Sequence, residues 1–186
     1  AATGCMVFDY LQIARSEPLT KAICDGIYTA VMTDTGCFRY SNTDSKSHTI
    51  AMECLDKGVK THEIYQLVYE NSSKARVSLL GNILTTLNYE LEGQLAWFII
   101  TQDMMHQASA SSSDVDGFSD FVRTIKGAEV ALMIYEQSYE SCRINFRSKG
   151  KFRVSDIAKA LGGGGHAFAA GSVIEGSLAD LKEKVV

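Results

Sequence analysis

Apolar residues in the first half of the chain recur every three or four positions, the spacing of helices that bury one face. This pattern predicts helices over residues 2–14, 19–32, 47–55, 61–69 and 76–89. Pro18 suits the first turn of the second helix, Ser47 is placed to cap the third, and Thr61 is placed to cap the fourth. The polar residues 71–75 interrupt the pattern. We therefore predict a helical unit over 1–72, followed by a connector helix within 73–90.

After Leu91 the pattern changes. Continuous apolar runs at 95–101 and 130–135, and alternation of polar and apolar residues at 142–147, predict β-strands. Apolar residues at helical spacing predict helices over 118–125, 154–161 and 178–186, and 172–174 is expected to be a last strand. A polar loop is expected over 108–113. The second unit, 91–186, is therefore predicted to be a smaller α/β domain, and the chain belongs to the α/β class.

Composition narrows the classes of function. The 186 residues are 46% apolar and carry a net charge of −4, which disfavours extended binding along a nucleic-acid backbone. No apolar run approaches the roughly 18 residues of a membrane span, and no signal peptide is visible. The five cysteines are scattered without CxxC spacing. They indicate reduced thiols in a cytoplasmic protein rather than a zinc site or a disulfide framework.

The most unusual stretch is 161–171, in which four glycines precede His166; they are Gly162, Gly163, Gly164 and Gly165. Glycine exposes its backbone N–H to an anion because no Cβ blocks the approach. The residues before the run have a helical pattern, and the Ala-rich residues after it are compatible with a helical turn. A glycine loop that leads into a helix start is expected to hold a phosphate, to which His166 donates a hydrogen bond. The alternative is a flexible hinge with a surface histidine.

A second candidate site is Thr33-Asp34-Thr35-Gly36, at the end of the second predicted helix. A carboxylate flanked by hydroxyls suits a hard divalent cation such as Mn²⁺ or Mg²⁺. The alternative is that Asp34 only caps a helix or turn. Arg39 follows in a polar segment and is a candidate phosphate contact, or else a surface arginine.

Two motifs resemble those of a known superfamily. The string GGGGHAFAAG at 162–171 resembles the glycine-histidine motif of the DHHA1 domain, the substrate-binding half of the DHH phosphoesterases. Residues 26–40 resemble the last metal-binding motif of the DHH catalytic domain, which implies that Asp34 binds metal. Arg147-Ser148 matches an Arg-Ser pair that precedes the glycine loop in DHHA1 domains, where the arginine helps to bind substrate phosphate. The resemblance implies the C-terminal part of a DHH domain, a connector helix and a DHHA1 domain with a mixed sheet.

The resemblance also identifies motifs that these residues lack. A DHH enzyme builds a two-metal site from a His-x-Asp-x-Asp motif, a further aspartate and an Asp-His-His triplet, and none occurs here. One carboxylate cannot hold two cations about 3.5–4 Å apart. The chain also begins without Met, inside a helical pattern. We therefore expect a fragment of a Mn²⁺- or Mg²⁺-dependent enzyme that is inactive alone.

Within the superfamily, the close succession of motifs looks most like the oligoribonuclease/pAp-phosphatase group. The substrate partners that this implies are very short RNA and 3′-phosphoadenosine 5′-phosphate (pAp). A RecJ-type single-strand exonuclease is an alternative, although the acidic balance disfavours it. A non-catalytic nucleotide- or RNA-binding module is another, although it has no need for a metal carboxylate. A homodimer is compatible with the sequence, and no membrane partner is expected.

Overall fold

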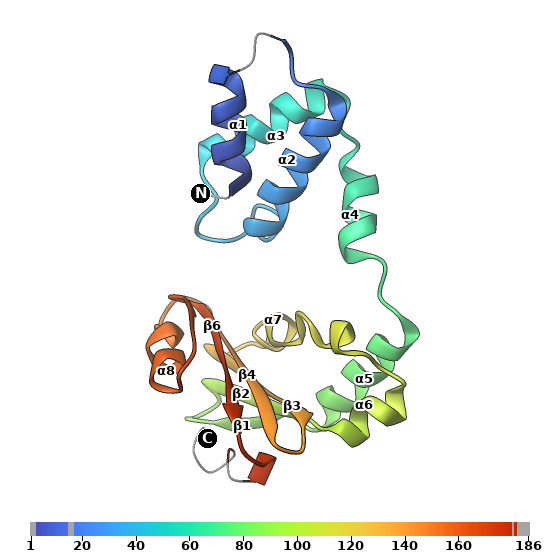
Figure 1. Cartoon of the computed structure of the whole chain (residues 1–186). Coiled ribbons are helices and arrows are strands. Elements are labelled where there is room, and N and C mark those ends of the chain that lie inside the picture. Colours follow the sequence, from blue (N-terminus) through green and yellow to red (C-terminus); the bar gives the residue numbers. More distant parts are fainter. Residues whose placement is uncertain (1–2, 15–16, 180, 182–186) are drawn as a thin grey trace. The chain divides into compact units, whose positions relative to one another are not determined.

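The computed structural model describes residues 3–14, 17–179 and 181. The chain divides into two compact units, Ala1–Asn71 and Ser72–Val186, each with its own core. Helices are followed by a mixed six-stranded sheet, which confirms the predicted α/β class (Figure 1). None of the helices in the described part of the chain is long and apolar enough to cross a membrane.

The first unit consists of helices α1 (Thr3–Ala14), α2 (Lys21–Asp34), α3 (Ser45–Asp56) and α4 (Thr61–Tyr69). Their apolar faces meet in one core, which contains Cys24, Val31 and Cys54. The helix periodicity is confirmed, but two predicted caps are wrong. Asp44, not Ser47, caps α3, because its carboxylate accepts a hydrogen bond from the Ser47 backbone N–H at 2.8 Å. α4 begins at Thr61 without any side-chain cap.

The second unit contains the sheet and the helices that cover it. Its strands are β1 (Asn88–Glu90), β2 (Leu95–Ile100), β3 (Val130–Ser138), β4 (Ser141–Ser148), β5 (Gly164–His166) and β6 (Ala169–Glu175). Its helices are α5 (Lys74–Thr85), α6 (Gln102–Ala108), the 3₁₀ turn η1 (Ser112–Val115), α7 (Phe118–Val122) and α8 (Val154–Ala160).

The strand order is β1-β2-β3-β4-β6-β5, so β1 and β5 are the edges. β2 and β3 are parallel, and all other neighbours are antiparallel. One sheet face packs against α5, α6 and α7, with Phe98 and Met133 among its buried residues. The opposite face packs against α8 and has the buried Trp97 in its core.

The connector helix is shorter than predicted. α5 ends at Thr85, and residues 88–90 form strand β1 instead of the last helical turn. Leu79 and Ile83 of α5 are fully buried in the core of the second unit. The helix therefore packs as part of that unit and not as a separate rod.

The first turn of α5 is tied to the rest of its unit. The Ser73 hydroxyl caps the helix by accepting from the Arg76 backbone N–H at 2.9 Å, and it donates to the Asp114 carboxylate at 2.6 Å. The Arg76 guanidinium lies over the Phe118 ring, 4.6 Å from its centroid. Hydrogen bonds from Ser73 and from Ser111 lower the pKa of Asp114 below its usual value.

The helix start expected after the glycine run is wrong. Residues 164–166 form β5, which turns and pairs with β6 through Gly164–Gly171, Gly165–Ala170 and His166–Ala169. Ala169 and Ala170 lie in β6 instead of a helical turn, because they pair across strands with β4 and β5. Of the final helix expected over 178–186, residues 180 and 182–186 lie outside the described part of the chain.

Candidate functional site

Strand register brings Arg147 and His166 onto one face of the sheet. Arg147 of β4 pairs with Ala169 of β6, and Ala169 pairs with His166 of β5. Directly paired residues of antiparallel strands point to the same face. Their backbones lie two strand spacings apart, about 10 Å, and the residue between them has only a methyl side chain.

The neighbouring row on the same face is formed by Asn145, Gly171 and Gly164. Together with the row of Arg147, Ala169 and His166 it makes a surface that we call the shelf. None of the six residues is buried. Two glycines and an alanine form its floor, so a ligand can approach the backbone closely.

Two aspartates of the α7 region orient the arginines beside the shelf. Arg147 Nε donates to Asp120 Oδ2 at 3.2 Å, and Arg143 Nη2 donates to Asp116 Oδ1 at 3.1 Å. The Arg143 guanidinium also lies over the Tyr135 ring, 5.5 Å from its centroid. The two arginine side chains are only partly exposed, so their orientation is restricted before any ligand arrives. No sequence motif marks Arg143, and its place beside Arg147 follows from the strand alternation of β4.

The glycines of the run serve the backbone in different ways. The N–H groups of Gly162 and Gly163 donate to Lys159 and Ala158 carbonyls at 3.0 and 2.8 Å, and so close the end of α8. A Cβ on Gly163 would lie 2.1 Å from the Gly171 carbonyl oxygen. Gly164 has open space where a Cβ would stand, and it lies on edge strand β5 with Gly165. Because β5 is an edge strand paired on one side only, alternate backbone N–H groups of β5, rather than those of a helix start, face away from the sheet.

Ser148 lies at the end of β4 and is 1% exposed. Its hydroxyl accepts hydrogen bonds from the backbone N–H groups of Gly150 and Phe152, at 3.1 and 3.4 Å. Its carbonyl accepts from Arg123 Nη1 at 3.2 Å. Ser148 therefore holds the turn that follows Arg147, and a direct contact with substrate is not required of it.

The Thr33–Gly36 segment ends α2 in an unusual turn. Gly36, Cys37 and Phe38 have φ values of 55°, 58° and 61°, in the left-handed region, which costs free energy for residues other than glycine. The Tyr40 ring closes over Gly36, where a Cβ would lie 2.4 Å from a ring carbon. The buried Thr35 hydroxyl accepts from the Phe38 N–H at 3.1 Å and donates to the Val31 carbonyl at 2.7 Å. The turn is held firmly despite its strain.

Asp34 is exposed at the last position of α2. Its Oδ2 accepts a hydrogen bond from Asn42 Nδ2 at 3.0 Å, which orients the carboxylate. Arg39 is also exposed, and its Nε donates to the Gly36 carbonyl at 2.8 Å. The structure thus brings Asp34 and Arg39 together on one turn.

The donor set at this turn fits a divalent cation in part. An oriented carboxylate is a suitable ligand for Mn²⁺ or Mg²⁺. Within the described residues, however, no three His, Cys, Asp or Glu side chains lie close enough together to hold a metal ion. Asp34 can therefore supply one ligand, and the others would have to come from elsewhere.

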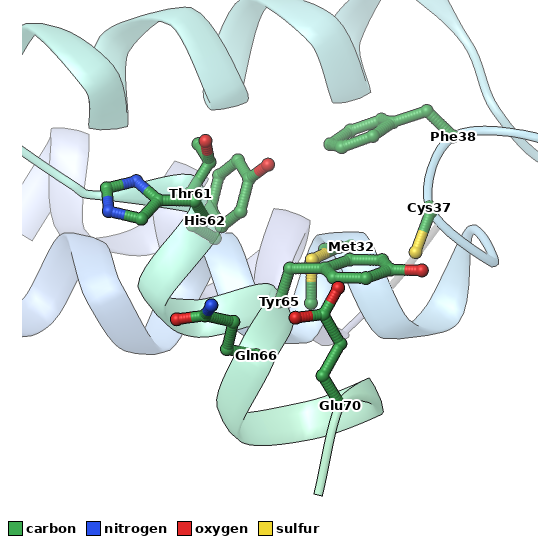
Figure 2. A pocket seen from close by; sticks show the side chains of 9 residues that line it. Met32, Cys37, Phe38, Thr61, His62, Tyr65, Gln66 and Glu70 are labelled. Carbon is green, nitrogen blue, oxygen red and sulfur yellow. The ribbon is translucent and has the colours of Figure 1, made fainter.

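A pocket of about 390 Å³ adjoins the turn, between α2 and α4 (Figure 2). No local sequence pattern predicts this pocket, because its walls come from separate segments; they are Tyr28, Met32, Cys37, Phe38, Thr61, His62, Tyr65, Gln66 and Glu70. Phe38 is already stacked on His48, with ring centroids 5.1 Å apart. Burial and a hydrogen bond with Cys37 raise the pKa of nearby Tyr69 to about 12, so this phenol stays protonated at neutral pH.

The mixed sheet and the glycine hairpin of β5 and β6 define an α/β domain of the DHHA1 kind. Residues 94–186 match the DHHA1 domain, and the chain belongs to this family.

Its relatives extend the likeness to both units. The chain is 32% identical over 177 residues to a bifunctional oligoribonuclease and PAP phosphatase of Thermus thermophilus, covering 95% of this chain and 52% of that protein. Its identity to the Bacillus subtilis protein of the same name is 28% over 155 residues, covering 83% and 48%. A crystal structure of an exopolyphosphatase-related protein from Bacteroides fragilis matches with a TM-score of 0.90 at 27% identity, covering 97% of this chain and 54% of that one. The chain thus spans about half the length of the relatives it matches.

Proposed function

We propose that this chain is the substrate-binding part of a metal-dependent phosphoesterase that hydrolyses very short RNA or pAp-like nucleotides. The observation that carries the proposal is the register that places Arg147 and His166 on opposite sides of a floor of glycine and alanine. Two relatives named as oligoribonucleases and PAP phosphatases support the substrate class.

Arg147 and His166 would bind a phosphate of the substrate that is not being cleaved. The guanidinium can hold two phosphate oxygens at once, and its pairing with Asp120 fixes its direction. The histidine would donate one hydrogen bond from the other side. Backbone N–H groups of Gly164 and Gly165 and the side chain of Arg39 are further phosphate contacts in this proposal.

Asp34 would be one ligand of a two-metal site, held in position by Asn42. When bound, Mn²⁺ or Mg²⁺ ions supply a nucleophilic hydroxide at neutral pH and neutralise charge on the phosphate. The remaining ligands would lie in the part of the protein that these 186 residues do not span. We accordingly propose that the chain alone binds substrate but does not turn it over.

The test uses a longer protein that includes the residues preceding Ala1. That protein should hydrolyse a dinucleotide and pAp in the presence of Mn²⁺, and Asp34→Asn should lower both kcat and Mn²⁺ affinity. Asp56→Asn is the matched control, because Asp56 is also an exposed aspartate at the last position of a helix. Equal activity of wild type and Asp34→Asn would show that Asp34 is not a metal ligand.

A non-catalytic nucleotide-binding module is the second candidate. It requires only the register that places Arg147 and His166 on one face of the sheet, and no metal ligand. Under this reading the longer protein would bind pAp and would release no phosphate with any divalent cation.

A further inference from the structure

Asn145 lies on the shelf between the two arginines of β4. Alternation along the strand places Arg143, Asn145 and Arg147 on the same face, because their neighbours Cys142, Ile144 and Phe146 are buried on the other. Asn145 is half-buried, and no hydrogen bond of its side chain occurs among those of the described residues. Its amide therefore offers both a donor and an acceptor to a ligand.

The direction of this amide is set by the neighbouring strand. A Cβ on Gly171 would lie 2.7 Å from Asn145 Oδ1. Oδ1 of the amide thus lies over Gly171 of β6, in the position that the side chain of any larger residue would fill. Gly171 is required for this arrangement, and nothing in the glycine motif itself points to Asn145.

Spacing along the strand indicates which part of a nucleotide the amide would meet. Asn145 and Arg147 are two residues apart, which is about 6.8 Å along a strand. A nucleotide whose phosphate is bound at Arg147 and which runs along β4 toward Asn145 would therefore place its sugar beside the amide. A sugar hydroxyl can donate to the amide oxygen and accept from the amide nitrogen, so it matches both functions of the side chain.

We propose that Asn145 recognises the 2′-hydroxyl of the nucleotide whose phosphate lies between Arg147 and His166, and so favours RNA over DNA. The inference rests on the proposed function, since it requires a phosphate on the shelf. A 2′-hydroxyl is the group by which a protein distinguishes the two nucleic acids at a given position. The structure assigns that role to a residue outside the glycine and Arg-Ser motifs.

The test measures binding of a 5′-phosphorylated diadenylate and of its 2′-deoxy counterpart to the 186-residue chain by isothermal titration calorimetry. One neutral hydrogen bond predicts that wild type binds the ribonucleotide about 2- to 12-fold more tightly. Asn145→Ala should lower affinity for the ribonucleotide to that for the deoxynucleotide, and leave the latter unchanged. Asn82→Ala, on the exposed side of α5, is the matched control and should keep the preference.

Equal affinity of wild type for the two ligands would overturn this inference while leaving the proposed function standing. Equal losses on both ligands in Asn145→Ala would also overturn it, because the amide would then serve the base or the fold. Binding of neither ligand by wild type would overturn the proposed function and this inference with it. Thermal unfolding checks that Asn145→Ala is folded. If that variant is not folded, Asn145→Ser, which keeps a shorter polar side chain, is measured in its place and judged by the same criteria.

Discussion

At the scale of single residues, glycines decide where the backbone can turn or approach another strand. Gly36 has φ +55°, a backbone conformation that residues with a side chain rarely adopt. It also lies under the Tyr40 ring, which leaves no space for a Cβ. Gly26, ten residues earlier, is an exposed helical position with no atom within 4 Å of a Cβ placed there.

Substitution of these two glycines should therefore have opposite effects on the first unit. Gly36→Ala is expected to lower the free energy of unfolding by about 1–3 kcal/mol, through strain and collision with Tyr40. Gly26→Ala is expected to raise it by about 0.5–1 kcal/mol, since alanine is the better helix former. Urea unfolding followed by circular dichroism measures both. Similar behaviour of the two variants would contradict the description of the turn.

At the scale of elements, the hairpin of β5 and β6 builds the shelf, and its glycines are not equivalent. A Cβ on Gly163 would collide with the backbone of β6, whereas one on Gly164 would meet nothing within 4 Å. Gly163→Ala should destabilise the second unit by about 1–3 kcal/mol, and Gly164→Ala should stay within about 0.5 kcal/mol of wild type. Equal tolerance of both changes in thermal unfolding would mean that β5 does not pair with β6 as described.

The first turn of α5 should respond to acid. Because hydrogen bonds from Ser73 and Ser111 lower the pKa of Asp114, the ionised carboxylate stabilises the folded state. That contribution is fully present above the unfolded pKa, about 3.9, and is lost as pH falls through the folded value. The difference in unfolding free energy between wild type and Asp114→Ala should therefore be constant above about pH 5 and shrink below about pH 4. A difference that does not change with pH would exclude this role for the carboxylate.

The elements also show what sequence alone could predict. Helices of the first unit and the apolar strands β2 and β3 follow from local periodicity, because each buries a regular set of side chains. β5 could not be found in this way, since glycine carries no hydrophobic pattern and its pairing depends on Gly171, a residue beyond the turn. α6 was missed as well, although Thr101 caps it at 3.1 Å from the Met104 N–H.

The residues of the candidate site also differ in whether the sequence alone could predict them. Motifs marked Asp34, Arg147 and His166, but the register that joins Arg147 to His166 is a long-range property of three strands. Asn145 carries no motif and becomes visible only through its position opposite Gly171.

At the scale of the whole molecule, the chain consists of two compact units, and the boundary between them along the sequence lies between residues 71 and 72. The segment from Glu70 to Ser73 is exposed and lies between α4 and α5. Limited digestion with a protease of broad specificity should cut there first and leave a folded product close to residues 72–186. Mass spectrometry identifies the cut. A first cut within either core, or a protected core that spans residues 70–73, would contradict the division into two units.

The central claim is that the shelf holds a phosphate of the substrate, and binding by the 186-residue chain tests it directly. The ligands are a dinucleotide with and without its 5′-phosphate, and the proteins are wild type, His166→Ala and, as a matched control, His106→Ala, which changes an exposed histidine on α6. A hydrogen bond to a charged group predicts that His166→Ala weakens binding of the phosphorylated ligand about 10- to 150-fold. The account predicts little change for the ligand without the phosphate, and none for either ligand in His106→Ala. Equal losses on both ligands in His166→Ala would contradict it.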